Sequence, residues 1–443
     1  MSTDIQDKSQ NYPSPVKAWL LVFLLLIIYT CSFVDRTILN LLINDIQADF
    51  QLNDKEFGML TGIAFGLCYA IFGLVFSRFA DTKSRKGIIA IGLVLWSLAT
   101  AFSAFARNFS QLFLMRMGVG VGEAALAPAA SSMIADSFPK AKLGLALSIY
   151  TTGVTLGMGF AYLFGGYVIG WSQLLPDIPS FGGEMMANWQ KVFLLVGLPG
   201  FLLAFLIMLI DEPIRKGLAH KAGISVSFAE LKVQFYKYKW AYIGVILGLT
   251  MAALLSFGII AFLTKFLQAK HGIAPAQMGQ TYGLIVMIFG TAGLLIGGFI
   301  CDKLQSLGRK DAPILGMLLA PLGYLLPSQM FAYTDNTQFM WVMIAVHTLF
   351  INCSTGVGYA AINMLTPNEM RGQFTALFVM VVGLAGAAMG PVVVGYINDE
   401  YYGGIAVNLG SSFMWVSLVT TAFAIWVLLK GRSQFIQSQN DQA

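Results

Sequence analysis

Stretches of about 20 apolar residues recur along the whole chain, and each is long enough to cross the ~30 Å hydrocarbon core of a bilayer as a helix. A soluble amphipathic helix would interrupt such a stretch with polar residues every few positions. The 443 residues are 57% hydrophobic and only 11% charged, whereas soluble domains are about 25% charged. The alternating pattern of a β-barrel strand is missing. The sequence therefore predicts an all-α integral membrane protein.

Twelve such stretches fall into two groups of six. The longest polar interruption, residues 211–239, separates the groups and predicts two six-helix bundles at residues 17–211 and 240–430. An N-terminal tail, a linker and a C-terminal tail complete the chain, at 1–16, 212–239 and 431–443. The predicted spans lie near residues 17–44, 56–79, 86–106, 112–137, 143–170, 189–210, 240–268, 276–300, 312–333, 338–365, 370–398 and 405–430.

Basic residues are distributed unevenly between the two sides of the membrane. Most of the 27 Lys and Arg residues lie in the tails and in every second connection, and the connections between these are acidic or nearly neutral. By the positive-inside rule, we expect a multi-pass protein of the inner (plasma) membrane with both termini in the cytoplasm. In the linker, apolar residues at helical spacing alternate with lysines between residues 228 and 239. This pattern predicts a short amphipathic helix on the cytoplasmic membrane surface, or alternatively a segment that binds a regulatory partner.

The two halves share features that indicate an internal repeat. The loop after the second span reads SRFADTKSRKG, and the loop after the eighth reads GFICDKLQSLGRKD, which places Asp81 opposite Asp302. The fifth and eleventh spans are rich in glycine, and small residues let helices cross closely. We expect bends near Gly157 in the fifth span and near Gly390 and Pro391 in the eleventh. Two related halves with bendable helices suit a transporter in which one bundle rocks against the other.

These motifs resemble those of the major facilitator superfamily. The resemblance rests on the charged loop with Asp81 and Arg85, on its weaker copy at Asp302 and on the run RMGVGVGE that begins at Arg116, and it covers nearly all of the chain. Within the superfamily, the motifs SFVDR, RFADTKSRK, LWSLATAFSAFARNF and RMGVGVGEAALAPAASSMIADSFP are most similar to spinster-like lipid transporters. The resemblance implies the major facilitator fold, in which two pseudo-symmetric six-helix bundles surround a central cavity and helices one and four line the N-terminal half.

Charged residues stand inside two of the predicted spans. Asp35 lies roughly 14 Å and Glu123 roughly 17 Å from the outer ends of the first and fourth helices, so the two carboxylates share a similar depth. Arg116 precedes Glu123 by seven residues, two helical turns, and the two side chains therefore lie on one helix face. With Arg36 included, the resemblance implies that two carboxylates and two guanidinium groups lie at the central cavity. A buried carboxylate must pair or take up a proton.

We therefore interpret Asp35 and Glu123 as proton-coupling residues, and Arg36 and Arg116 as residues that tune them or bind an anionic headgroup. The alternative is a fixed ionic clamp between helices, although buried ion pairs stabilise poorly compared with apolar packing. The C-terminal bundle looks apolar and aromatic-rich, with only His347 and Asn352 as possible polar contacts. For His347, a hydrogen-bonded packing role is the favoured interpretation.

The duplicated charged loop predicts a cytoplasmic latch. We expect Asp81 to cap the start of the eleventh helix near Gly372, and Arg85 to pair with Asp136 when the cytoplasmic side is closed. Asp302 is the corresponding residue of the second half.

Other chemistry is missing from the sequence. There is no GxxxxGK[ST] phosphate loop, no grouping of a nucleophile with a base, and no metal-ligand spacing among the three histidines. We expect no enzyme activity, no cofactor, no metal and no nucleic-acid partner. The expected partners are the lipid bilayer, protons and an amphipathic lipid substrate, and we expect a monomer.

Three functions are consistent with these features. The leading hypothesis is proton-coupled export of amphipathic lipids, such as lysolipids or sphingoid phosphates, by alternating access. The second is proton-coupled import of organic anions or sugar acids by the same superfamily. A second buried basic residue in the C-terminal half would favour it, and the sequence offers only Lys265 near an outer helix end. The third is a non-transporting receptor or sensor, which the thirteen residues after Lys430 are too few to support as a signalling tail.

Overall fold

The computed structural model describes residues 12–179, 185–215, 228–367 and 370–441. These residues form helices joined by turns and loops, with one isolated bridge between Pro179 and Met185. They contain twelve helical spans that are long and apolar enough to cross a membrane. The all-α fold class with two bundles of six spans is thereby confirmed.

Some spans are single helices and others are interrupted. The first bundle contains α1 (Pro15–Leu41), α3 with α4 (Asp54–Thr61, Ile63–Thr82), α5 (Arg85–Ser103), α6 with α7 (Phe109–Ala124, Leu126–Ser137), α8 (Lys140–Ser172) and α9 with α10 (Asn188–Gly197, Pro199–Leu209). The second contains α12 (Lys239–His271), α13, η2 and α14 (Pro275–Ile285, Val286–Gly290, Thr291–Ser306), α15 (Ala312–Tyr333), α16 (Thr337–Leu365), α17, η3 and α18 (Arg371–Val381, Val382–Ala388, Met389–Tyr402) and α19 (Leu409–Asp441). Two short helices of the described chain lie outside the spans, α2 (Ile43–Phe50) and α11 (Phe228–Lys237), and the short helix η4 (Ala406–Asn408) begins the last span.

The helix ends follow local capping rules. Asn53 and Glu56 form a reciprocal capping box at the start of α3, which satisfies N–H groups that have no partner inside the helix. Asn336 caps α16 in a similar way through the N–H of Phe339, at 3.0 Å. At a C-terminal helix end, Gly272 follows the last residue of α12 with a backbone φ of +65°, a conformation that favours glycine. The last helix continues to Asp441, beyond residue 430 where the predicted span ends.

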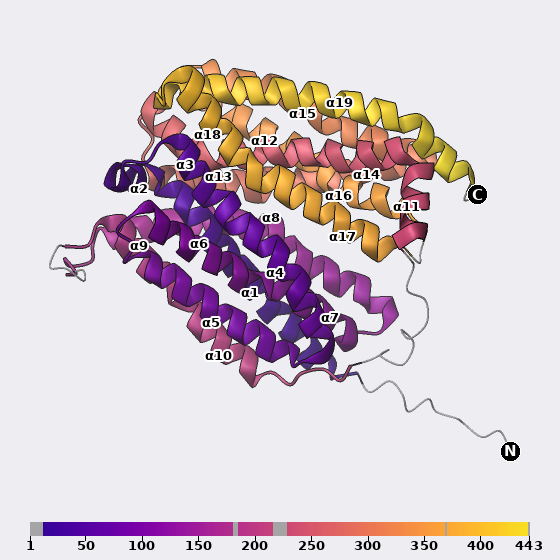
Figure 1. The fold of residues 1–443 in the computed structure, drawn as a ribbon, viewed down its shortest axis with the longest axis horizontal. Helices are drawn as coiled ribbons and strands as arrows, with labels where there is room; N and C mark the ends of the chain where they lie inside the picture. Colours follow the sequence, from indigo (N-terminus) through magenta and orange to yellow (C-terminus); the bar gives the residue numbers. More distant parts are fainter. Residues whose placement is uncertain (1–11, 180–184, 216–227, 368–369, 442–443) are drawn as a thin grey trace.

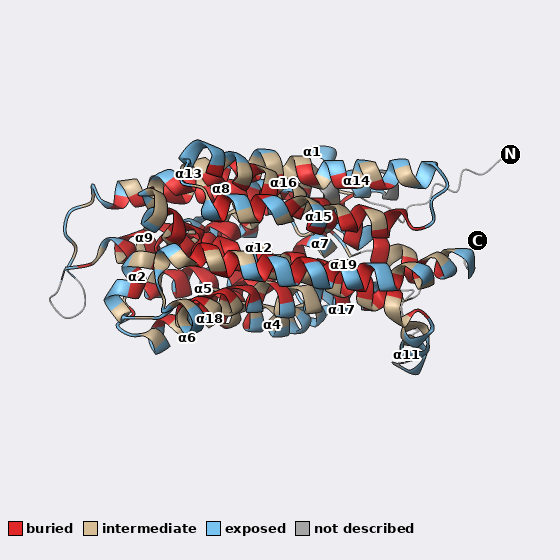
Figure 2. Cartoon of the chain, turned by 90° about the horizontal axis from the view of Figure 1, so that it is seen from above, coloured by how far each residue is buried: buried red, intermediate tan, exposed pale blue. Residues whose placement is uncertain are grey.

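The two bundles lie side by side, and the start of α1 and the end of α19 lie at one end of the helices, on the right of Figure 1. We call this the terminus-bearing end and the other the opposite end. At the opposite end one apolar core crosses between the bundles, for example where the rings of Phe57 and Phe262 approach to 6.0 Å. At the terminus-bearing end each bundle has its own apolar core. The burial pattern in Figure 2 shows the buried residues concentrated along the interior of the molecule. The bundles are therefore joined at the opposite end and separate toward the termini.

Glycines allow the close contact at the opposite end. A Cβ atom on Gly62 would lie 2.0 Å from the carbonyl oxygen of Ala388, and one on Gly283 would lie 2.5 Å from that of Gly159. These glycines belong to the pairs α4 with η3 and α8 with α13, which connect the bundles. Because only glycine lets the backbones approach so closely, this end is built for tight closure.

Two spans of the second bundle contain a π-helical segment, η2 in the eighth span and η3 in the eleventh. Such segments mark local changes of helix direction and occur often at functional positions. The segment η3 ends two residues before Gly390, so the irregularity lies just beside the predicted bend at Gly390 and Pro391. Helix α8, in contrast, is continuous through Gly157, which packs against Phe33 and Thr30.

Candidate functional site

A cavity of about 810 Å³ lies between the two bundles. Its wall extends from Thr61 and Pro391, near the opposite end, to Gly372, the second residue of α17 at the terminus-bearing end. The volume lies within the range of about 300–1,000 Å³ that is common for small-molecule sites. Because the bundles join at the opposite end, the cavity opens toward the terminus-bearing end.

Four predicted charged residues meet beside this cavity. Arg36 Nε donates a hydrogen bond of 2.6 Å to Glu123 Oε2, and the pair joins α1 to α6. The Glu123 side chain is fully buried, whereas the Arg36 side chain is 24% exposed and lines the cavity. The Arg36 guanidinium also lies 4.6 Å from the ring centre of Phe65 and 4.9 Å from that of Tyr69. Arg36 is thus held by one carboxylate and by aromatic faces that attract cations.

Asp35 and Arg116 form the second half of this charged group. Arg116 Nη1 donates to the backbone carbonyl of Asp35 at 3.1 Å, and both residues are buried. Among the described residues, Asp35 Oδ1, Glu123 Oε1 and Arg116 Nε have no hydrogen-bond partner. The ion pair in this structure is Arg36 with Glu123, and the Asp35 carboxylate forms none within the described part of the chain. A buried carboxylate without a counter-ion is a site where a proton binds favourably.

The cavity wall differs between the two bundles. The first bundle contributes polar or charged groups from α1, α3, α4, α6 and α7: Arg36, Thr37, Asn40, Thr61, Tyr69, Arg116 and Ser131. The second bundle contributes Thr375 as its one hydroxyl-bearing residue among otherwise apolar wall residues: Phe257, Ile260, Ala261, Gly372, Ala376, Val379, Met380, Gly383, Ala387, Ala388 and Pro391. Both charged residues of the described wall therefore lie on the first-bundle face, among apolar residues, whereas the second-bundle face is almost entirely apolar.

The two polar contacts predicted for the second bundle do not line the cavity. His347 Nδ1 lies 2.9 Å from Ser328 Oγ, and its ring packs against Tyr324 and Phe331 inside the second bundle. Asn352 donates to the Thr348 carbonyl oxygen at 2.8 Å, one turn earlier on α16. The face of α16 that carries His347 points toward α15, so the packing interpretation of this histidine fits the structure.

The predicted latch at the terminus-bearing end is formed only within the first bundle. Arg85, which is fully buried, pairs with Asp136 and also with Glu212, at 3.1 Å to Oε1. The Asp81 side chain is exposed, and the space beside Gly372 is open, with no described atom within 4 Å of a Cβ position there. Asp81 therefore does not cap α17 in this open arrangement.

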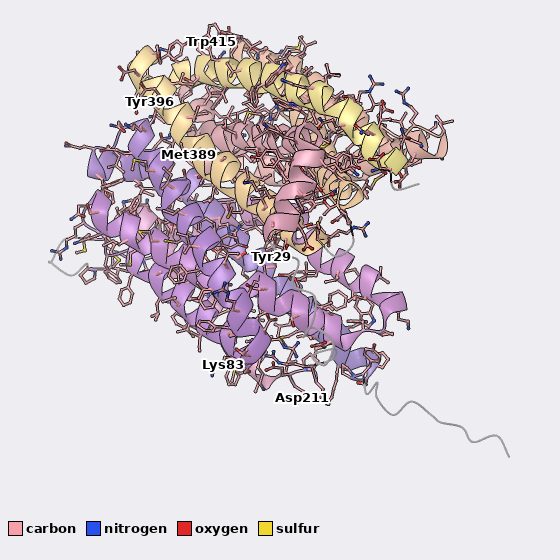
Figure 3. All side chains as sticks on the ribbon, turned by 45° about the vertical axis from the view of Figure 1, so that its right-hand side comes forward. Tyr29, Lys83, Asp211, Met389, Tyr396 and Trp415 are labelled. Carbon is pink, nitrogen blue, oxygen red and sulfur yellow. The ribbon has the colours of Figure 1, made fainter. Side chains whose placement is uncertain are left out.

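An acidic residue of this region, Glu212, was missed by the sequence analysis. Besides its contacts with Arg85, Glu212 accepts a hydrogen bond from Ser84 Oγ at 2.6 Å. Burial acts to raise the pKa of Glu212, but the hydrogen bonds from Ser84 and Arg85 together hold it below its usual value. Figure 3 shows Lys83 and Asp211, the neighbours of Ser84 and Glu212 in the chain, at the same end of the first bundle. The only sequence signal for this contact was the presence of adjacent acidic and proline residues in the linker.

In the second half, Asp311, which the sequence analysis did not single out, is an acidic residue that binds arginines. Asp311 pairs with Arg309 at 3.1 Å and with Arg432 at 2.7 Å, whereas Asp302 is exposed and forms no ion pair in the described chain. The hydrogen bond from Arg309, aided by Arg432, lowers the pKa of Asp311 although burial acts to raise it. The repeat predicted the charged loop and placed Asp302 opposite Asp81, but it gave no signal for Asp311, which lies nine residues after Asp302.

A polar network at the opposite end was also missed. Asp54, which is buried, pairs with Lys265 of the second bundle and accepts hydrogen bonds from Asn398 Nδ2 and Gln47 Nε2, both at 2.7 Å. Asp399 of the second bundle accepts from the backbone N–H groups at the start of α3. A lysine within an apolar span requires a partner, so Lys265 was a signal that could have directed attention to this end.

Comparison with known proteins supports this architecture. A family model described as the Major Facilitator Superfamily matches residues 25–334. An MFS-type efflux pump of Mycolicibacterium smegmatis is 27% identical over 87% of this chain and 86% of its own length. A probable galactarate/D-glucarate transporter of Bacillus subtilis is 26% identical, with 86% and 85% covered. Protein spinster homolog 3 of Mus musculus is 24% identical, with 86% and 75% covered.

The fold is shared with a solved structure of a bacterial homolog of the human lysosomal transporter Spinster, in an inward-facing and unoccupied conformation. The TM-score is 0.78 at 23% sequence identity, and the alignment covers 97% of this chain and 98% of the other. The resemblance to spinster-like proteins expected from the sequence motifs is thereby confirmed.

Proposed function

Since this chain belongs to the major facilitator superfamily, we propose that it is a secondary active transporter that exports amphipathic lipids with an anionic headgroup in exchange for protons. The observation that carries this proposal is the two-faced cavity. Arg36 and Arg116 lie on its first-bundle side, and nearly all of its second-bundle side is apolar. A molecule with a charged head and a hydrocarbon tail complements both faces at once.

The proposed proton site is the pair of buried carboxylates. Arg36 pairs with Glu123 in this structure, while Asp35 has no ion pair among the described residues. A headgroup that binds Arg36 competes with Glu123, so the released carboxylate takes up a proton or finds another cation. Substrate binding and proton binding are thereby linked through the same guanidinium group.

In the proposed orientation, the protein lies in the inner membrane and its terminus-bearing end faces the cytoplasm. The uneven distribution of Lys and Arg supports this orientation. In this orientation the structure is open to the cytoplasm, and a lipid headgroup from the cytoplasmic side has access to the arginines. Alternating access would then require the network at the opposite end to open.

Import of a sugar acid is the second candidate, because probable transporters of such compounds are among the relatives. A small dianion would need basic residues on both sides of the cavity. Lys265, the one candidate that the sequence offers in the second bundle, is engaged by Asp54 at the opposite end and does not line the cavity. The apolar second face therefore favours the amphipathic substrate.

Transport by the full chain in proteoliposomes tests the two candidates. We expect proton-gradient-dependent movement of lysolipids or sphingoid phosphates, and no movement of galactarate or glucarate. Arg36→Gln should abolish the lipid flux, whereas Arg107→Gln, which removes an exposed charge from the same bundle, should preserve it. Gradient-driven uptake of sugar acids without lipid movement would support the second candidate instead.

A further inference from the structure

A cluster of lysines and aromatic rings lies on the second bundle at the terminus-bearing end, away from the cavity. Lys430 Nζ of α19 lies 3.6 Å from the ring centre of Trp240 and 5.1 Å from that of Trp426. Lys239 Nζ lies 5.8 Å from the Trp240 ring and 5.9 Å from the Tyr236 ring. One tryptophan ring thus has two ammonium groups beside it, from helices that are far apart in the sequence.

Carboxylates of the described residues do not neutralise the positive charge of this cluster. In the described part of the chain, neither Lys239 nor Lys430 forms an ion pair, and the same holds for Lys232 on α11, whose Nζ lies 6.0 Å from the Tyr236 ring. Lys237 differs, because it pairs with Asp441 at 3.2 Å. Two like charges beside one ring repel each other, so an anion placed between them would be bound favourably.

The cluster also lies where apolar helix surface ends. Along α19, the exposed residues before Lys430 are large and apolar: Trp415, Leu418, Val419, Phe423, Trp426 and Leu429. After Lys430 the helix continues with Arg432, Gln434 and other polar residues. Tryptophan is enriched at the level of the lipid headgroups, where its amphipathic ring has both an apolar and a polar environment. Trp240 and Trp426 therefore mark the boundary between hydrocarbon and headgroups on this face.

We propose that Lys239 and Lys430 bind the anionic headgroup of an acidic phospholipid in the membrane leaflet at the terminus-bearing end, with its acyl chain along Trp426 and Phe423. The phosphodiester of such a lipid carries one negative charge and two non-bridging acceptor oxygens, one for each ammonium, and the neighbouring apolar helix surface favours an anion that carries a hydrocarbon chain. The exposed apolar residues of α11, Val233 and Tyr236, extend the same surface. This site is separate from the cavity and does not depend on the transported substrate.

Native mass spectrometry of the full chain tests this proposal. The protein in neutral detergent is titrated with phosphatidylglycerol or phosphatidylcholine, and bound lipids are counted. Each basic group near a lipid surface contributes about 1 kcal/mol, so each single variant, Lys239→Gln or Lys430→Gln, should bind phosphatidylglycerol about fivefold more weakly and the double variant about 30-fold. Binding of phosphatidylcholine should not change.

Three controls separate the charge effect from general damage. Lys83→Gln with Lys142→Gln removes two exposed charges from the same end of the first bundle and should leave the affinity unchanged. The variant Lys239→Arg with Lys430→Arg retains both charges and should retain the preference for phosphatidylglycerol. Glycerol phosphate, which lacks acyl chains, should not displace the lipid at equal concentration. Equal binding of the two lipids by the wild type, an unaffected double glutamine variant, or displacement by glycerol phosphate would each overturn the proposal.

Discussion

Asp399, near the end of α18 in the second bundle, accepts a hydrogen bond of 2.7 Å from the backbone N–H of Lys55 at the start of α3 in the first bundle. The other Asp399 oxygen accepts from the N–H of Asp54 at 3.1 Å. These N–H groups have no partner within their own helix, and a negative charge is favourable at a helix N-terminus. A carboxylate of one bundle thus caps a helix of the other. The sequence predicted the same kind of cap at the terminus-bearing end, where Asp81 of the first bundle would cap α17 of the second.

We predict that Lys265→Met opens the opposite end. The change leaves the buried carboxylate of Asp54 without its counter-ion, which costs about 3–5 kcal/mol in the closed arrangement and is relieved when water enters. Spin labels at the exposed positions Ala48 and Tyr401, in different bundles, should show a longer distance in a larger fraction of molecules. Lys270→Met is the matched control on the same helix, because the acidic partner of Lys270, Asp335, is almost fully exposed. An unchanged distance distribution for Lys265→Met would show that this ion pair does not hold the end closed.

We predict that Gly62→Ala also disfavours closure at this end. A Cβ atom at residue 62 would lie 2.0 Å from the carbonyl oxygen of Ala388, and both partners are backbone segments that cannot turn aside. Overpacking of this kind costs about 1–3 kcal/mol. The control is Gly73→Ala on the same helix, where the added methyl group meets open space. The same label pair measures both variants, and equal behaviour of the two would contradict the tight crossing.

The charged site illustrates what the sequence could predict. Asp35, Arg36, Arg116 and Glu123 stood out because charges inside apolar spans are rare, and their common depth follows from helix length alone. The pairing was not predictable. Adjacent residues project about 100° apart around a helix, so Arg36 cannot face the same way as Asp35, and only the arrangement of the helices in the folded bundle selects Glu123 of α6 as its partner.

Contacts between the bundles were beyond the sequence for a similar reason. Asp54 and Lys265 are 211 residues apart, and their pairing depends on how two separately folded bundles meet. To predict where the His347 side chain lies, one must know how α16 is rotated about its axis. A span that is apolar on all sides does not reveal this rotation. Most span boundaries, in contrast, were predictable because loop charges are local signals, although α14 and α19 continue past the predicted ends at residues 300 and 430.

We predict that Glu212→Gln weakens the first-bundle latch at neutral pH but not in acid. The pKa of Glu212 lies below its usual value, so its ionised form is favoured in the folded protein. This contribution is present above the pKa of the unfolded chain and is lost as the pH falls through the lower pKa of the folded state. Because Glu212 is partly exposed, we expect a loss of about 1 kcal/mol at pH 7. Thermal unfolding of the two proteins should differ at pH 7 and converge near pH 3. A constant difference at all pH values would assign the effect to packing.

The last prediction concerns Asp35 and Glu123. Asp35→Asn and Glu123→Gln imitate the protonated carboxylic acids with little change in shape. Each variant should therefore fix the ratio between molecules that are open and molecules that are closed at the terminus-bearing end, and this ratio should no longer respond to pH. Spin labels at Lys83 and Leu307, which are exposed in different bundles at the terminus-bearing end, report the opening of the cavity. For the wild type we expect the open fraction to change between about pH 5 and pH 8, since burial makes a carboxylate protonate at higher pH than in water.

The control for this pair is Asp302→Asn, which removes an exposed carboxylate at the same end and should leave the response intact. Flux measurements separate coupling from binding. If Asp35 carries the proton, Asp35→Asn should bind the lipid but no longer move it in response to a proton gradient, because in the proposed mechanism only the guanidinium groups contact the headgroup. An Asp35→Asn protein with the wild-type pH response and gradient-driven flux would instead identify the charged group as a fixed clamp between α1 and α6, with Arg36 and Glu123 as its two members.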